Sequence, residues 1–294
     1  MHPLRSFLFT PGNHPRKVEK VFSVGADAVI LDLEDAVAIA EKVATRATIV
    51  EALKRPHRGL GYVRVNAIDT VYCYGDILAI VGPWLDGIVL PKVEAADQLK
   101  TIDWLLAQVE RERGLAVGKI DLLPIVETGL GVHRLDEICG SKTRVKRISF
   151  GAGDYTRDMG LKWSGEEQEL AFTRAKMVLA SRVAELEAPI DTVFIDLKDR
   201  VHLEASIATA LNVGFQGKLC IHPDQVPLVN DAFTPTAAEV ARAEKIIAAF
   251  KKAEAEGSAS IQVDGYFVDY PIVVKAQRVL DITARIKAAA EAQS

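Results

Sequence analysis

Two acidic residues end apolar segments of the chain, and together they have the chemistry of a metal site. Glu127 follows the run Asp-Leu-Leu-Pro-Ile-Val, and Asp154 follows Arg-Ile-Ser-Phe-Gly-Ala-Gly. In a parallel α/β fold, ligands bind beyond the carboxyl ends of the strands. Mg²⁺ takes one or two protein carboxylates and completes its shell with water and substrate. The pair therefore predicts a Mg²⁺ site, with capping of the following helices as the structural alternative.

Other charged residues also end apolar runs. Three acids, Asp32, Glu34 and Asp35, interrupt one run, and such acids are rarely buried unless they are paired or bind metal. We expect them at the mouth of the barrel, either with a functional role or with a structural one, in which they cap the next helix or pair with Arg64 or Lys92. Arg64 ends another run, where its planar guanidinium could bind a substrate carboxylate through two hydrogen bonds. For Lys92 we favour a structural pairing with the acids.

Signatures of other chemistries are weak or missing. Of the six histidines, only His222 ends a predicted strand, where it could contact a substrate or support a loop. Asp191, Asp196 and Asp199 form a further acidic group, for which we expect at least one helix cap. The sequence contains no HExxH, GxSxG, GxGxxG or GxxxxGKS/T pattern, which argues against zinc hydrolysis, triad chemistry and nucleotide loops.

A repeating β/α pattern must position these residues. Eight β-rich runs alternate with helical stretches, at 6–10, 28–34, 61–66, 87–93, 121–127, 147–154, 192–197 and 218–223. Most are continuous Val/Ile/Leu runs, as expected for parallel strands buried on both faces. Intervening stretches such as 95–113 and 165–187 carry apolar residues at helical spacing. Eight units predict an α/β fold of the (β/α)₈ TIM-barrel type rather than a doubly wound sheet.

The residues after the eighth run are additional to this barrel. They predict an amphipathic helix over 237–256, a hairpin over 262–269 with Asp264-Gly265 at its turn, and a last helix from Pro271. We therefore divide the chain into a TIM-barrel catalytic domain, residues 1–232, and a C-terminal helical and hairpin lid extension, residues 233–294. Such an extension could cover the active site of its own chain or of a neighbour.

Composition limits the partners and the compartment. The chain has 294 residues, 49% hydrophobic and 26% charged, which is typical of a globular protein. Its net charge of −4 argues against nucleic-acid binding. Three cysteines without zinc or disulfide spacing fit a reducing compartment. The N-terminal apolar stretch is too short for a signal peptide, and no run suits a membrane span, so we expect a cytoplasmic protein without a membrane partner.

The motifs together resemble the citrate lyase β-subunit-like CoA-ester lyases of the HpcH/HpaI aldolase superfamily. The resemblance runs nearly end to end and rests on Arg5-Ser-Phe-Leu-Phe-Thr-Pro-Gly, Leu31-Asp-Leu-Glu-Asp-Ala-Val, Arg64-Val-Asn, Leu90-Pro-Lys-Val-Glu, Ile125-Val-Glu-Thr, Phe150-Gly-Ala-Gly-Asp, Gly217-Lys-Leu-Cys-Ile-His-Pro and Phe233-Thr-Pro. It implies a Mg²⁺-dependent barrel, usually a trimer, in which Glu127 and Asp154 bind the metal and Arg64 binds the substrate.

The resemblance also implies an acyl-CoA substrate and further site residues. The CoA path would follow Phe9, Arg16 and Lys20, with Ile221 and His222 near the thioester end. The C-terminal stretch resembles the lid of malyl-CoA and citramalyl-CoA lyases, in which a neighbouring subunit supplies a catalytic aspartate. The matching segment is Gly-Tyr-Phe-Val-Asp269, which assigns that role to Asp269 and implies a homo-oligomer, either a trimer or a hexamer built from trimers.

The sequence departs from the family pattern at two places. Gly129 stands where relatives often have alanine, and His14 stands where some have another basic residue. Neither replaces a metal ligand, although both could alter acyl or CoA preference.

The implied reaction is cleavage of a 3-hydroxy-dicarboxylic acyl-CoA, such as malyl-, methylmalyl- or citramalyl-CoA, to an acyl-CoA and a 2-oxo acid. Four alternatives stay open. They are a citrate lyase β subunit acting on citryl groups, a malyl-CoA thioesterase, a class II pyruvate aldolase that needs no CoA, and a ligand-binding barrel without catalysis.

Overall fold

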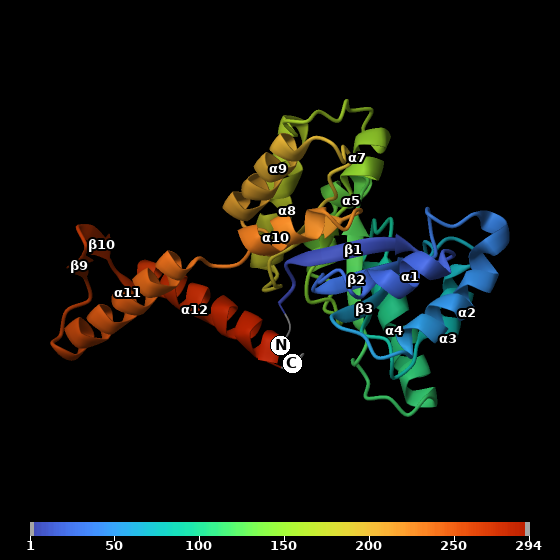
Figure 1. The fold of residues 1–294 in the computed structure, drawn as a ribbon, viewed down its shortest axis with the longest axis horizontal. Helices are drawn as coiled ribbons and strands as arrows, with labels where there is room; N and C mark the ends of the chain where they lie inside the picture. Colours follow the sequence, from blue (N-terminus) through green and yellow to red (C-terminus); the bar gives the residue numbers. More distant parts are fainter. Residues whose placement is uncertain (1–2, 292–294) are drawn as a thin grey trace. The chain divides into compact units, whose positions relative to one another are not determined.

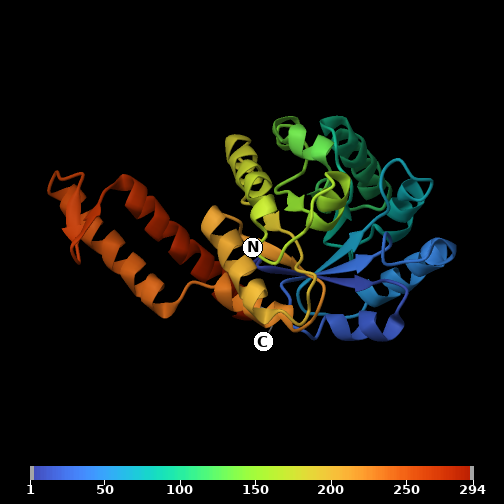
Figure 2. The same ribbon diagram turned by 90° about the horizontal axis from the view of Figure 1, so that it is seen from above.

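The computed structural model describes residues 3–291 and divides into two compact units, residues 4–230 and the C-terminal residues from Asp231 onward. In the first unit, eight parallel strands close into a barrel in the order β1 to β8, and β1 pairs with both β2 and β8. Helices surround these strands (Figures 1 and 2). The predicted TIM barrel is therefore confirmed.

The strands and helices of the barrel unit alternate along the chain. The strands are β1 (Ser6–Pro11), β2 (Ala28–Asp32), β3 (Leu60–Arg64), β4 (Gly87–Leu90), β5 (Asp121–Val126), β6 (Ser149–Phe150), β7 (Ile190–Asp191) and β8 (Gly217–Cys220). The helices are α1 (Pro15–Val21), α2 (Lys42–Leu53), α3 (Cys73–Ile80), α4 (Ala96–Glu112), α5 (Gly129–His133), α6 (Leu135–Cys139), α7 (Ala152–Asp158), α8 (Ala171–Val183), α9 (Arg200–Val213) and α10 (Gln225–Ala232). Short 3₁₀ helices, η1 (Ile39–Glu41) and η2 (Gln168–Leu170), precede α2 and α8.

Two strands depart most from their predicted ranges. The expected strand over 147–154 is reduced to β6, because α7 begins directly after Gly151. Asp154 therefore lies in the first turn of a helix and does not end a strand. The expected strand over 192–197 was wrong, since β7 ends before it and its apolar residues Ile195 and Leu197 are exposed. A continuous apolar run indicates burial without showing which part pairs in a sheet.

Side chains along the strands alternate between the barrel interior and the surrounding helices. The interior cluster consists of Phe7, Ala28, Ile30, Tyr62, Val89, Leu123, Ile125, Ile190 and Leu219. Its members are at most 3% exposed, so the barrel is filled by packed side chains. This filled interior forms the floor beneath the residues at the strand ends.

A network of buried charges connects β7 and β8 to α8 and α9. Asp191 accepts hydrogen bonds from Nε of Arg174 at 2.9 Å and from Nζ of Lys218 at 2.6 Å. Glu167 accepts from Nη2 of Arg174 at 2.6 Å and from the hydroxyl of Ser206 at 2.7 Å. The two cations and two carboxylates are each at most 3% exposed. Each charged group contacts a group of opposite charge, so the charges within this closed network cancel.

The C-terminal unit is built from α11 (Ala237–Ala255), β9 (Ile261–Val263), β10 (Tyr266–Val268) and α12 (Tyr270–Glu291). Thr236 and Glu239 form a capping box that starts α11. The two strands form the predicted antiparallel hairpin, with Asp264 and Gly265 at its turn in the left-handed region. The unit has its own core of Ala243, Ile246, Phe250, Val263, Val268 and Ala276. Within residues 3–291, no helix is long and apolar enough to cross a membrane.

Candidate active site

The alternation that fills the barrel also positions the candidate site residues. Continuing two residues beyond the interior positions Ile30, Tyr62 and Ile125 leads to Asp32, Arg64 and Glu127. The same step from Phe7 and Leu219 leads to Phe9 and Ile221. Because inward positions recur every second residue along a strand, side chains from five strands converge at the carboxyl end of the barrel.

Arg64 lies among the acids that follow β2. Its Nε and Nη2 donate to the two carboxylate oxygens of Asp32 at 2.8 and 2.6 Å, and its Nη1 lies 3.0 Å from Oε2 of Glu34. Burial alone would lower the pKa of Arg64, but these carboxylates outweigh it and the net shift is upward. Burial also raises the pKa of Asp32, yet Arg64 and two backbone N–H groups reverse this and hold the pKa below its usual value.

Two sequence expectations bear on this cluster. The pairing of the acids with Arg64 and Lys92 is confirmed, since Nζ of Lys92 lies 2.5 Å from Glu34 and 3.6 Å from Asp35. The fork of Arg64 that was expected to take a substrate carboxylate is already used on Asp32. Two hydrogen bonds to Asp32 fix the guanidinium plane, so only the remaining N–H groups are available to a ligand.

Glu127 follows β5 directly and is 3% exposed. Its Oε1 accepts the backbone N–H of Lys92 at 2.7 Å. Burial and the neighbouring carboxylate of Asp154 raise the pKa of Glu127 to about 8. A methyl group at Gly151 would lie 2.6 Å from Cβ of Glu127 and closer still to its carboxylate, so only glycine leaves room for this side chain.

Asp154 reaches the site from the first turn of α7. Its Oδ1 lies 2.6 Å from Nη2 of Arg157, which is 73% exposed. The start of α7 is held in place because the hydroxyl of Thr192 accepts the N–H of Ala152 at 2.8 Å. Thr192 continues the inward positions of β7, and sequence reasoning missed this supporting role.

The charges at the mouth fit a hard divalent cation. Five carboxyl groups, Asp32, Glu34, Asp35, Glu127 and Asp154, lie near three cationic side chains, Arg64, Lys92 and Arg157, so acidic groups outnumber basic ones by two, and the raised pKa of Glu127 reflects this imbalance. Among residues 3–291, no set of three His, Cys, Asp or Glu side chains is arranged to hold a metal. Mg²⁺ needs only one or two protein carboxylates, which the pair of Glu127 and Asp154 supplies.

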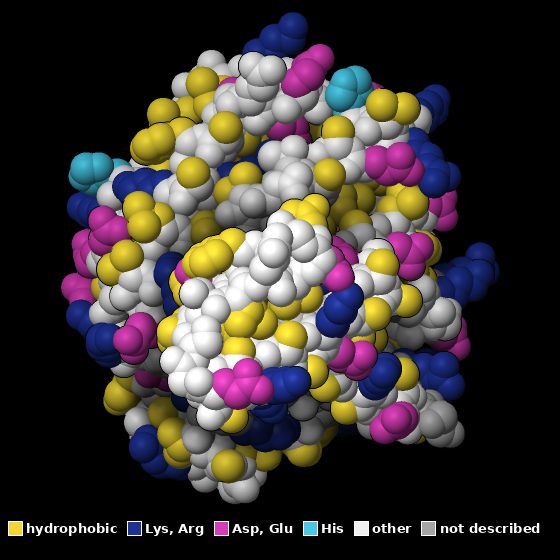
Figure 3. Space-filling view, turned by 90° about the vertical axis from the view of Figure 1, so that its left-hand side faces the viewer, with side chains coloured by type: hydrophobic (Ala, Val, Ile, Leu, Met, Phe, Trp, Pro, Cys, Tyr) yellow, Lys and Arg dark blue, Asp and Glu magenta, His cyan; other side chains and the backbone are white. Residues whose placement is uncertain are grey.

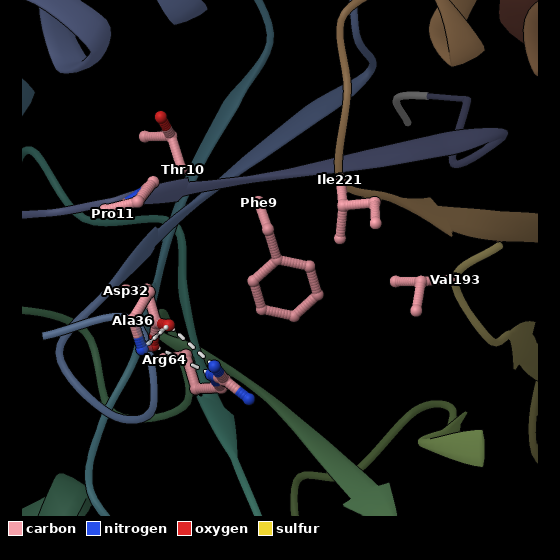
Figure 4. A pocket seen from close by; sticks show the side chains of 8 residues that line it. All are labelled: Phe9, Thr10, Pro11, Asp32, Ala36, Arg64, Val193 and Ile221. Carbon is pink, nitrogen blue, oxygen red and sulfur yellow. Dashed lines mark hydrogen bonds and ion pairs between the residues drawn. The ribbon is translucent and has the colours of Figure 1, made fainter. Parts of the chain in front are cut away.

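A cavity of about 270 Å³ opens beside this cluster. Figure 4 shows the ring of Phe9 between Arg64 on one side and Ile221 with Val193 on the other. The guanidinium carbon of Arg64 lies 5.0 Å from the centre of the Phe9 ring, a cation–π distance. Sequence analysis did not select Val193. The predicted strand over 192–197 placed it at the start of a strand, whereas in the structure β7 ends at Asp191 and Val193 lies beyond the carboxyl end of that strand. The cavity thus has one charged wall and one apolar wall.

The other predicted site residues of the barrel unit lie at the same end of the strands. Arg16 and Lys20 are exposed on α1, which follows the carboxyl end of β1. His222 is half-buried just beyond β8, and it lines a second cavity of about 450 Å³ with residues of α9 and α10. The backbone N–H groups of Ile221 and His222 both donate to Oε1 of Gln225, at 2.9 and 3.3 Å.

Asp269 belongs to the C-terminal unit, where it is the residue before α12. Its Oδ1 accepts the N–H of Ile272 at 3.4 Å, so the carboxylate caps the helix. Figure 3 faces this unit and shows hydrophobic side chains lying between charged ones. The exposed apolar residues beside Asp269 are Tyr266, Phe267, Tyr270 and Val274. Clusters of exposed apolar residues are common at interaction surfaces.

The fold and the site define a TIM-barrel enzyme with acidic and cationic groups at the strand ends. The family model described as HpcH/HpaI aldolase/citrate lyase matches residues 5–223, and the chain belongs to this family. It is accordingly a carbon–carbon lyase of the aldolase superfamily.

Named relatives match nearly the whole chain. Citrate lyase subunit beta of Leuconostoc mesenteroides subsp. cremoris is 37% identical, over 95% of this chain and 92% of that protein. L-malyl-CoA/beta-methylmalyl-CoA lyase of Cereibacter sphaeroides is 32% identical, over 95% and 94%. The crystal structure of CitE from Mycobacterium tuberculosis with magnesium, acetoacetate and coenzyme A is 28% identical, has a TM-score of 0.75, and aligns over 95% of this chain and 98% of that one.

Proposed function

We propose that the protein is a Mg²⁺-dependent lyase that cleaves a 3-hydroxy-dicarboxylic acyl-CoA, of the malyl-, methylmalyl- or citramalyl-CoA type, to an acyl-CoA and a 2-oxo acid. The observation that carries this proposal is the buried Glu127 beside Asp154, in a site with more carboxylates than cations. The magnesium in the CitE structure and the substrate in the name of the malyl-CoA lyase support it.

Glu127 and Asp154 would hold the ion. When bound, Mg²⁺ supplies Lewis-acid stabilisation of the substrate's carboxylate and hydroxyl or keto oxygens. Arg64, fixed by Asp32, directs its remaining N–H groups at the negative charge that develops on the thioester oxygen during cleavage. Phe9, Val193 and Ile221 exclude water from the reacting carbons.

Cleavage requires a proton to leave the substrate hydroxyl and another to reach the acyl-CoA enolate. The carbon–carbon bond breaks as the hydroxyl-bearing carbon becomes the keto carbon of the 2-oxo acid. We assign the proton transfer at the enolate carbon to Asp269, supplied by the same chain or by a neighbouring subunit. Arg16 and Lys20 offer exposed cations to the CoA phosphates, with Ile221 and His222 toward the thioester.

The first test is product analysis by mass spectrometry after incubation with Mg²⁺ and malyl-CoA, citramalyl-CoA or citryl-CoA. Acetyl-CoA together with glyoxylate, pyruvate or oxaloacetate supports the lyase and names its substrate. Free acid and CoA would instead indicate a thioesterase. The lyase proposal fails if no substrate of the panel turns over, or if EDTA leaves turnover unchanged.

The alternative with specific support is a citrate lyase β subunit, because the relative of that name is 37% identical. Turnover of citryl groups on an acyl-carrier protein, without turnover of free CoA esters, would favour it. Activity on CoA-free aldols would favour the pyruvate aldolase. We also propose a cytoplasmic homo-oligomer, and light scattering after size-exclusion chromatography measures its mass.

A further inference from the structure

The backbone at Lys92 is strained at the point where it contacts the candidate metal site. Lys92 has φ of 54°, in the left-handed region that residues with a side chain rarely adopt. Such conformations persist only where the surrounding structure imposes them, and they are concentrated at functional sites. The conformation of Lys92 therefore calls for a physical cause in its contacts.

Two successive N–H groups explain the backbone conformation. The N–H of Lys92 donates to Oε1 of Glu127 at 2.7 Å, and the N–H of Val93 donates to the carbonyl of Ile125 at 3.1 Å. Both acceptors belong to the end of β5, so the chain after β4 turns both N–H groups toward the same neighbouring strand. The N–H of Lys92 thus holds the Glu127 carboxyl group, and the N–H of Val93 fixes the turn to the backbone of β5.

The side chain of Lys92 contacts the opposite wall of the site. Its Nζ lies 2.5 Å from Oε1 of Glu34, whose other oxygen lies 3.0 Å from Nη1 of Arg64. Lys92 therefore contacts both walls of the site. Its backbone N–H binds Glu127, and its ammonium group binds Glu34, which in turn contacts Arg64. A glycine would adopt this backbone conformation freely but could not make the second contact.

We propose that Lys92 is a positioning residue, whose left-handed backbone orients Glu127 for a divalent cation and whose ammonium fixes Glu34 against Arg64. The inference rests on the proposed function, since it assumes that Glu127 is a metal ligand. Lys92 would have two roles, one for its backbone and one for its ammonium group, and different variants test each role.

The backbone task is tested with Lys92→Gly and Lys92→Val, which both lack the ammonium and differ in their tolerance of positive φ. The readout is Mn²⁺ affinity of the substrate-free protein, measured by electron paramagnetic resonance. We expect the Val variant to bind Mn²⁺ about 10- to 100-fold more weakly than the Gly variant, the usual range for loss of a group that orients a metal ligand. Equal affinities in two variants with wild-type circular dichroism overturn this half. If the Val variant does not fold, Lys92→Ala replaces it under the same criterion.

The side-chain task is tested with Lys92→Met and Lys92→Arg. Met is unbranched at Cβ like Lys, so the backbone conformation should be kept and the Mn²⁺ affinity should stay within about threefold of wild type. Met lacks the charge that holds Glu34, so Arg64 should be misplaced and kcat should fall by up to about 100-fold. Arg should restore most of kcat. Wild-type kcat in the Met variant overturns this half. Failure of the wild-type protein to bind Mn²⁺ would instead refute the metal site of the proposed function.

Discussion

The barrel contains two groups of buried charges that differ in their balance. The network beside β7 and β8 sets Arg174 and Lys218 against Asp191 and Glu167, so that its charges cancel. The mouth of the barrel has two more carboxylates than cations, and the pKa of Glu127 is raised there to about 8. Asp32, Glu34 and Glu127 at the mouth are buried like the members of the network, whereas Asp35 and Arg157 are exposed. At the mouth, acidic groups outnumber cationic ones, so this group can bind a further cation and is the candidate site. In the network beside β7 and β8 the charges are balanced, and we interpret that network as structural.

The largest effect should follow from Glu127→Gln. Gln keeps an oxygen that can accept the N–H of Lys92 but loses the charge that would bind the ion. We expect kcat to fall by about 10³-fold, because a metal contributes several kcal/mol to such a transition state. Calorimetry should show loss of Mn²⁺ binding, whereas the melting temperature of the metal-free variant should not decrease, since burial and Asp154 already disfavour the ionised form of Glu127. Mn²⁺ affinity equal to that of wild type would refute the assignment.

Asp269→Asn should lower kcat by about 10²-fold, at the lower end of the range for loss of an acid or base. Asn is also a good helix cap, so α12 should be preserved and Mn²⁺ affinity unchanged. The matched control is Asp264→Asn in the same hairpin, where Asn tolerates the positive φ and turnover should stay near wild type. Steady-state kinetics with a substrate identified from the panel provide the measurement. Equal losses in both variants would indicate a structural effect of the hairpin.

Asp191→Asn should affect stability and not metal binding. It leaves Arg174 and Lys218 buried with too little opposing charge, which costs about 3–5 kcal/mol of unfolding free energy. Urea unfolding measures this loss, and Mn²⁺ affinity serves as the internal control. A variant as stable as wild type would show that the closed network contributes no stability.

The loss caused by Asp191→Asn should depend on pH. Burial raises the pKa of Asp191, but Lys218 and Arg174 outweigh it, and the net pKa is lowered. The carboxylate of Asp191 therefore binds a proton more readily in the unfolded state than in the folded state. The stabilisation is complete above the pKa of the unfolded state, about 3.9, and is lost as the pH falls through the lower pKa of the folded state. Unfolding curves of wild type and variant should therefore converge only at strongly acidic pH. Convergence already near neutral pH would contradict this sign.

The smallest effect should follow from Arg200→Ala. Its ion pair with Glu204 at 2.8 Å is exposed on both sides, so its loss should change the unfolding free energy by less than about 0.5 kcal/mol. Thermal unfolding measures the change. A loss as large as that of Asp191→Asn would mean that burial does not determine the strength of these ion pairs.

The sequence was sufficient to predict the barrel and the positions of Arg64 and Glu127 at the carboxyl ends of their strands. Arg64 and Glu127 could be located because each continues the alternation of inward positions along its strand. Asp154 was selected for its neighbouring glycines and assigned to the wrong element, a strand in place of the first turn of α7. Asp154 still lies at the carboxyl end of the barrel, because β6 ends there and α7 begins there, and its role as a metal ligand stays a prediction.

Other features depend on neighbours that are distant in the sequence. The need for glycine at 151 follows from the Glu127 side chain that fills the space of its Cβ. The positive φ of Lys92 follows from acceptors at the end of β5. No local pattern encodes either contact, because each joins segments that meet only after the barrel has closed.

Closure of the barrel also bears on how the protein folds. β1 pairs with β8 through Ser6 and Lys218, two residues separated by almost the full length of the barrel unit. Until β8 is formed, one edge of β1 has no partner, and exposed strand edges promote association between chains. Contacts between residues so far apart in sequence slow folding, because the intervening chain must be ordered first. We therefore expect the seam between β1 and β8 to be among the last parts of the sheet to form, and the refolding yield to fall as protein concentration rises.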